Sequence, residues 1–203
     1  MFMQLLALVQ QAVMYSTLQK YGGEEQAILM GGFFRYLMLT FIPLWGLSQG
    51  FQPFVGTNFG AGLFDRVKKG TFAFYLFGVL IALIGWVCFL ISPEGILSLF
   101  INDVAMIAKG KMDAIIAYII FPIVPVLILN ITLFQALGKA KAAGLIAIDR
   151  QFLLFVPLCI LLPIWFGSRG VWLSMPIVDG IMFLLSILLV IGVFKKDLKR
   201  KVN

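Results

Sequence analysis

Four charged residues lie inside long apolar stretches of this sequence, where an ionised side chain is expensive to bury. They are Arg35, Asp149, Arg150 and Asp179. A charge near the centre of a bilayer costs at least about 2.5–3.5 kcal/mol, so such a residue needs a partner, a water-filled cavity or a function. A buried aspartate can take up a proton or a sodium ion. These four residues are therefore the first candidates for binding a cation or a substrate.

Two of the four are expected at a similar depth. Arg35 lies about 16 Å along its helix from Glu24, and Asp179 lies about 14 Å from Gly170, at 1.5 Å per residue. Both depths are measured from the same membrane face. We predict that the two side chains approach each other inside the bundle, either as a functional site or as an ion pair that only holds helices together.

The other two charged residues are adjacent in the sequence. Asp149 and Arg150 lie about 12–14 Å from Lys141. Neighbouring residues on a helix do not face each other, so we expect one to line a cavity and the other to extend towards the surface. The alternative is that other helices neutralise both. Asp113 lies near a helix end beside two lysines, and we expect it to be solvated.

Three uncharged polar residues are weaker candidates for binding cargo. Gln49 and Gln52 have i, i+3 spacing and share one helix face, and Asn130 lies deep in an apolar stretch. Such side chains often only join helices by hydrogen bonds. Gly46 and Gly50, spaced four apart, permit close helix packing.

The composition indicates an integral membrane protein. Hydrophobic residues make up 62% of the chain, charged residues make up 12%, and the mean hydropathy is +1.04. Soluble domains are roughly 45–50% apolar and 25% charged. The net charge of +7 comes from basic residues in short loops and the tail, which favours membrane topology over nucleic-acid binding.

Histidine is absent, and the two cysteines are isolated from each other. The sequence therefore offers no Ser-His or Cys-His pair and no metal-ligand cluster. We predict that the chain is not an enzyme and that it holds no metal or cofactor, apart from Na⁺ or H⁺ as a coupling ion.

Six apolar stretches are long enough to cross a bilayer, which needs about 20 residues. The sequence thus predicts an all-α, polytopic transmembrane six-helix bundle that forms a single domain over residues 1–203. Pro43 and Pro53 should bend the second span, and Pro122 and Pro125 should break the fourth. The spans cover about 2–18, 24–56, 70–91, 112–137, 142–165 and 171–194.

Loop charges predict the orientation of these spans. Cytoplasmic loops carry an excess of Lys and Arg. If six helices alternate, one side collects most of the basic residues, namely Arg66, Lys68, Lys69, Lys139, Lys141, Lys195, Lys196, Lys199, Arg200 and Lys201. We therefore expect a multi-pass protein of the plasma membrane with its C-terminus in the cytoplasm.

Several motifs resemble the multidrug and toxic compound extrusion (MATE) family. Gly46-Leu-Ser-Gln-Gly-Phe-Gln-Pro-Phe-Val-Gly-Thr-Asn-Phe-Gly-Ala61 with Arg66-Val-Lys-Lys69 is similar to the end of that family's eighth helix and the following loop. Phe134-Gln-Ala-Leu-Gly-Lys-Ala-Lys141 resembles the end of its tenth helix. Arg150-Gln151 with Pro157 and Leu162-Pro163 resembles its eleventh helix. Gly170-Val-Trp and Pro176-Ile-Val-Asp179 resemble its twelfth helix.

The resemblance implies the C-terminal lobe of a twelve-helix, two-lobed transporter. Members exchange cationic or amphipathic drugs and metabolites for Na⁺ or H⁺. The N-terminal lobe, which carries the cation-binding acid in many relatives, would be the partner and is absent from this sequence. The first span offers only glutamines, so Asp179 or Asp149 would be the acid that binds a coupling cation here.

Two other functions fit the same features. One is a flippase for lipid-linked precursors from the same superfamily. The other is a membrane fragment without transport. The abrupt start at Met1 leads us to expect a piece of a longer protein, although a half-transporter that pairs with itself is also compatible with the sequence.

Overall fold

The computed structural model describes residues 2–196. All secondary-structure elements in this range are helical, as the sequence predicts. Its helices are α1 (Phe2–Gly60), α2 (Phe64–Ile91), α3 (Pro93–Ser98), α4 (Val104–Tyr118), α5 (Val124–Ala136), α6 (Ala140–Ile148), α7 (Phe155–Phe166) and α8 (Ser168–Lys196). A 3₁₀ turn, η1 (Phe121–Ile123), precedes α5, and a π turn, η2 (Asp149–Leu154), joins α6 to α7.

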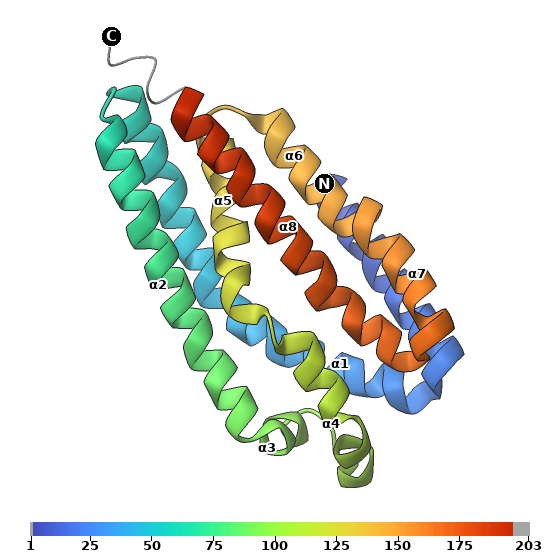
Figure 1. Cartoon of the computed structure of the whole chain (residues 1–203). Coiled ribbons are helices and arrows are strands. Elements are labelled where there is room, and N and C mark those ends of the chain that lie inside the picture. Colours follow the sequence, from blue (N-terminus) through green and yellow to red (C-terminus); the bar gives the residue numbers. More distant parts are fainter. Residues whose placement is uncertain (1, 197–203) are drawn as a thin grey trace.

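Helix α1 contains two of the six spans. Its 59 residues would extend about 88 Å, nearly three times the hydrocarbon thickness of a bilayer. Gly23, with φ 74° and ψ −171°, interrupts the helical backbone, and glycine adopts such a positive φ without strain. At this point the chain reverses direction (Figure 1). Five long apolar helices thereby provide six membrane crossings, and the six-helix bundle is confirmed.

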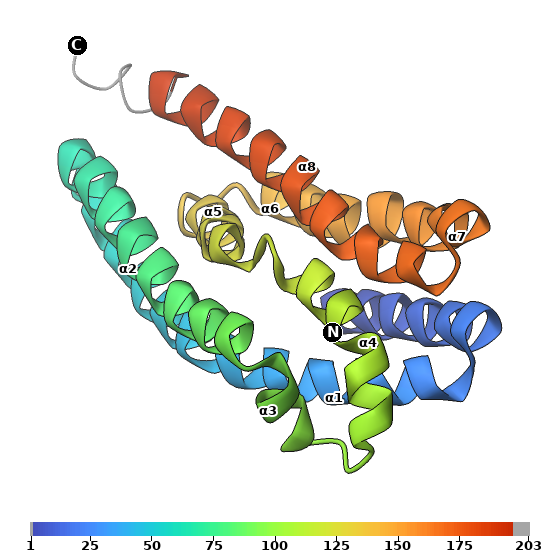
Figure 2. The same ribbon diagram turned by 60° about the horizontal axis from the view of Figure 1, so that its bottom comes forward.

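The two arms of α1 differ in length. The first arm covers residues 2–22 and the second covers residues 24–60. The second arm contains Pro43 and Pro53 and bends upward to run beside α2 (Figures 1 and 2). The sequence-based expectation of a bent second span is therefore confirmed.

The fourth span is broken where its prolines predict. Proline lacks an N–H, and its ring clashes with the carbonyl four residues earlier. For Pro122 that carbonyl belongs to Tyr118, which is the last residue of α4. The chain resumes as η1 and then α5, which has Pro125 in its first turn. The fifth span contains the π turn η2 but is helical without a gap from Ala140 to Phe166, and this turn was not expected from the sequence.

Aromatic side chains form the centre of the core. The ring of Phe33 packs edge-on against Phe89, Tyr118 and Trp172, with centroid distances of 5.5–5.9 Å. Gly170 lets α8 approach the backbone of α7, because a Cβ there would overlap the carbonyl carbon of Leu162. These contacts fix the helices around the charged residues described next.

The outer surface is apolar over most of its length, as a lipid-facing surface must be. Large side chains stand out from the helices, among them Phe72, Ile84 and Leu188, which are 71%, 68% and 65% exposed. Lys199, Arg200 and Lys201, which contribute to the predicted orientation, lie outside the described residues.

Candidate functional site

Asp179 and Arg150 form an ion pair between α8 and the π turn η2. The Arg150 Nε donates to the Asp179 Oδ1 at 2.8 Å. The side chain of Arg150 is 25% exposed and that of Asp179 is 16% exposed, so the pair is largely buried but not sealed inside the bundle. The predicted partner of Asp179, Arg35, was wrong.

Arg35 instead lies on the exposed side of α1. Its guanidinium donates to the carbonyl oxygen of Phe100, in the segment after α3, at 3.4 Å. The estimate of depth along each helix was insufficient, because it does not say which way a helix faces. The residue that pairs with Asp179 is Arg150, which lies in η2.

Small cavities lie beside the ion pair. One of about 120 Å³ is lined by Gln10, Arg150 and Asp179 together with aromatic residues at the α4–η1 break, including Tyr118 and Phe121. A second of about 40 Å³ shares these three polar residues. A site needs only about 10–15 Å³ of such volume to hold a water molecule, so there is room for water or a small cation.

The helix break at η1 and the π turn η2 both lie next to this cavity. Arg150 lies in η2, and Phe121 begins η1. A broken transmembrane helix leaves carbonyl groups that neighbours, water or an ion must satisfy. The arrangement therefore combines a carboxylate, a competing arginine, a glutamine and irregular backbone, which is a suitable environment for exchanging a cation or a proton.

Gln10 was not among the sequence-based site candidates. It lies in the first arm of α1 and completes the polar part of the cavity lining. The signal was present as a polar residue inside an apolar span, but glutamines recur in that span and the sequence did not distinguish them.

The remaining candidates do not join this site. Asp149 is half-buried beside Arg150 but is not among the residues lining the cavity. Gln49 and Gln52 are exposed on the second arm of α1. On the same arm, a Cβ added to Gly46 or Gly50 would meet no atom within 4 Å, so this surface is open in the lobe.

Asn130 has the bridging environment that the sequence left as an alternative. It is fully buried, accepts a hydrogen bond from the Tyr75 hydroxyl and donates to the Ser186 Oγ at 2.8 Å. The amide thus connects α5 to α2 and α8, and its donor and acceptor groups are both engaged.

Asp113 is buried, contrary to the expectation of a solvated residue. Its side chain is 6% exposed, and its Oδ1 accepts from the Arg169 Nε at 3.0 Å. Its other oxygen accepts from the Gln26 Nε2 at 3.2 Å, and Gln26 in turn accepts from the Trp172 indole. The nearby lysines led to the expectation that Asp113 is exposed to solvent. Arg169, which lies 56 residues later in the sequence, instead pairs with Asp113 and covers it.

The segment Gly46-Leu-Ser-Gln-Gly50 has the letters of a hydrolase nucleophile motif, Gly-x-Ser-x-Gly. That motif requires the serine on a sharp strand-to-helix turn. Ser48 lies within α1, and its hydroxyl forms a hydrogen bond with that of Thr132 at 2.7 Å. Its environment is that of a helix-packing residue.

Comparisons with known proteins agree on one family. The MatE family model matches residues 1–161. No curated protein sequence matches the chain. The fold is similar to an outward-facing multidrug resistance MATE transporter of the MOP superfamily, with TM-score 0.85 and 20% identity over 98% of this chain and 45% of that one.

Two other solved structures give the same result. An inward-facing multidrug resistance MATE transporter aligns with TM-score 0.85 and 16% identity, over 96% of this chain and 46% of that one. A MATE protein in a bent conformation aligns with TM-score 0.88 and 17% identity, over 97% and 44%. The chain thus spans about half the length of the transporters that it resembles, which corresponds to one lobe.

Proposed function

The chain belongs to the MatE family, and on that premise we propose that it is the C-terminal lobe of a cation-coupled antiporter. The transporter would export drugs or other amphipathic or cationic xenobiotics across the plasma membrane in exchange for Na⁺ or H⁺. The observation that carries the proposal is the Arg150–Asp179 ion pair beside a cavity that borders the η1 helix break and the π turn η2.

Competition at Asp179 provides a coupling mechanism. In one state Arg150 neutralises the carboxylate, and in the other a proton or Na⁺ does so and frees the arginine. A ligand shifts a two-state equilibrium only by binding one state better than the other. Asp179 satisfies this condition, because its carboxylate is free to bind a cation only in the state in which Arg150 has moved away. The irregular backbone beside it permits this local movement.

Movement of the lobe as a unit is supported by the two similar transporters in opposite states. The lobe matches the outward-facing and the inward-facing structure equally well. Rocking of this lobe against a second lobe would therefore expose a central cavity to each side in turn. The open surface of α1 around Gly46 and Gln49 is our proposed contact with the N-terminal lobe.

Dye efflux from a pump-deficient bacterium tests the proposal, with the complete reading frame expressed. Asp179→Asn should lower efflux at least tenfold with unchanged expression, because the exchangeable charge is lost. The matched control is Asp113→Asn, which removes the buried acid of the other Arg–Asp pair. This control should retain efflux per folded molecule, and unchanged efflux in Asp179→Asn would contradict the coupling role.

The same strains distinguish the flippase alternative. If the protein moves lipid-linked precursors, dye efflux should be absent in the wild type, and deletion should impair cell-wall or glycan export. That combination would replace the antiporter proposal.

A further inference from the structure

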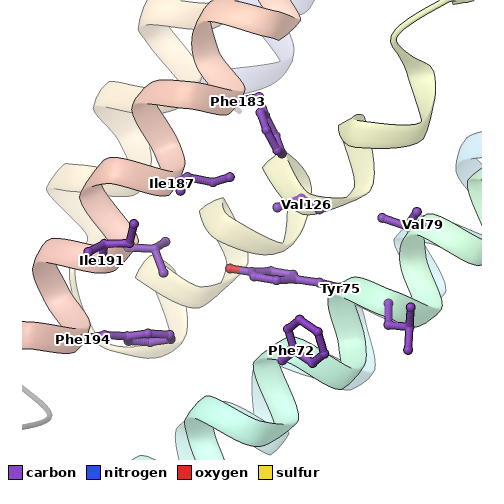
Figure 3. Close-up of a pocket in the computed structure, with 10 residues that line it drawn as sticks. Phe72, Tyr75, Val79, Val126, Phe183, Ile187, Ile191 and Phe194 are labelled. Carbon is purple, nitrogen blue, oxygen red and sulfur yellow. The ribbon is translucent and has the colours of Figure 1, made fainter.

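A wide groove on the bundle surface lies away from the Arg150–Asp179 site. It has a volume of about 440 Å³ and runs between α2 and α8, with α5 as its floor (Figure 3). Val126 and Val190 are buried at the bottom, while Phe72 and Ile191 are 71% and 44% exposed at the rim. We call it the α2–α8 groove.

The lining of the α2–α8 groove is apolar. Its one polar side chain among the lining residues, that of Tyr75, uses its hydroxyl as a donor to Asn130. The groove therefore offers neither a carboxylate for a cationic drug nor a free hydrogen-bonding group. Such a surface at membrane depth suits a hydrocarbon chain.

The length of the groove matches one leaflet. On α8 it extends from Phe183 to Phe194, about 16 Å at 1.5 Å per residue. Half of a hydrocarbon core of roughly 30 Å is about 15 Å. A lipid acyl chain inserted from one membrane face would thus fill the groove to the bilayer centre.

Basic residues stand at one end of the groove only. Lys69 continues the helix face of Phe72 at i+3 spacing, and Lys195 continues the face of Ile191 at i+4 spacing. Arg66 and Lys68 lie on the same turns of α2, where Asp65 is the neighbouring acid. Within the described part of the chain, no ion pair joins these four cations to an acid.

We infer that the α2–α8 groove binds an anionic phospholipid, with an acyl chain between α2 and α8 and the phosphate at Lys69 and Lys195. The apolar trough supplies chain binding, and the cations select the head group, because basic residues beside a membrane attract anionic lipids. The residues that line the groove come from α2, α5 and α8, and none comes from the second arm of α1, so this site leaves the proposed lobe contact free.

Native mass spectrometry of the purified 203-residue chain tests the site with defined lipids. Dioleoyl phosphatidylglycerol should bind at a single saturable site, at least tenfold more tightly than dioleoyl phosphatidylcholine. Glycerol phosphate without acyl chains should not bind detectably, which separates a lipid site from a free phosphate site.

Matched substitutions locate the lipid. Ile187→Trp fills the groove and should weaken phosphatidylglycerol binding at least tenfold, whereas Leu188→Trp, on the neighbouring lipid-facing surface, should not change it. Combined Lys69→Gln and Lys195→Gln should remove the preference for the anionic lipid. Lys20→Gln, an exposed residue in the first arm of α1, is the charge control.

Three results would overturn the inference. The first is equal loss of binding in both tryptophan variants. The second is equal affinity for the two lipids, which would indicate only non-specific annular lipid. The third is a dimer whose abundance falls in Ile187→Trp, since the groove would then be occupied by a second copy of the chain.

Discussion

The two Arg–Asp pairs in the described part of the chain have different surroundings. Asp113 is 6% exposed and has both oxygens engaged, whereas Asp179 is 16% exposed and borders a cavity. An acid with fully occupied oxygens is a structural clamp. An acid with space beside it can exchange its partner, which is why we propose Asp179 as the acid that binds the coupling cation.

The coupling between Arg150 and Asp179 can be measured by a double-mutant cycle. Removing one partner of a buried pair leaves the other charge uncompensated. Because both side chains are partly exposed, we expect Arg150→Gln to lower the free energy of unfolding by about 1–3 kcal/mol, less than for a fully buried pair. Adding Asp179→Asn to this variant should restore part of the loss. Additive losses, measured by unfolding in detergent, would show that the pair is not coupled.

Asn130 should matter for stability more than for transport. Asn130→Leu removes its hydrogen bonds with Tyr75 and Ser186, and bonds between membrane helices contribute about 0.6–1.7 kcal/mol each. We expect a loss of about 1–2 kcal/mol in unfolding free energy. Gln49→Leu, at an exposed position, should change it by less than about 0.5 kcal/mol. Equal losses in the two variants would contradict the bridging role.

Individual side-chain partners were the least predictable features. Counting residues along a helix estimates depth but does not say which way the helix faces, so Arg35, which lies on the exposed side of α1, was chosen in place of Arg150. The prediction that Asp113 is solvated was wrong for a related reason, because its partner Arg169 lies far along the chain. Sequence position gives the place of a residue along its helix. A contact between two side chains also depends on how each helix is rotated and which helices are neighbours.

At the scale of helices, the spans and their breaks could be predicted better from the sequence than individual contacts could. Six apolar stretches and the break at Pro122 were foreseen because proline and hydrocarbon thickness act locally. The π turn η2 was not, since it depends on how the fifth span packs. Its consequence is large, because η2 carries Arg150.

The open surface of α1 can be probed with glycine substitutions. A Cβ added at Gly46 would meet no atom within 4 Å, so in Gly46→Leu the lobe should unfold no more easily and can gain up to about 1 kcal/mol of helix propensity. In the complete transporter the same change should block lobe contact and lower efflux. Gly78→Leu is the contrasting variant, because its Cβ lies 3.0 Å from Pro125, and it should destabilise the lobe itself. Normal efflux in Gly46→Leu would exclude this surface as the contact.

Loop accessibility tests the predicted orientation. In a Cys88→Ala background, Leu63→Cys lies in the turn between α1 and α2, and Leu99→Cys lies after α3 at the opposite end of the bundle (Figure 1). If the basic end is cytoplasmic, a membrane-impermeant maleimide on intact cells should label only Leu99→Cys. Inside-out vesicles should give the reverse pattern. Labelling of Leu63→Cys on intact cells would invert the topology.

At the scale of the whole molecule, the size of the cavity limits what one lobe can do. Pockets for drug-sized ligands measure roughly 300–1,000 Å³. The cavity beside Arg150 and Asp179 measures about 120 Å³, which suits an ion or water but not such a cargo. We therefore propose that the remaining cargo surface comes from a second lobe, in keeping with the chain spanning about 45% of a similar transporter.

Reconstitution provides the corresponding prediction. The 203-residue chain alone in proteoliposomes should show no dye transport above empty liposomes under an imposed Na⁺ or proton gradient. Co-reconstitution with an N-terminal lobe, or use of the complete reading frame, should produce transport that collapses with an ionophore. Gradient-driven transport by the chain alone would instead demonstrate a self-pairing half-transporter. In that case two copies of the Arg150–Asp179 site would face one cavity, and Asp179→Asn would remove both at once.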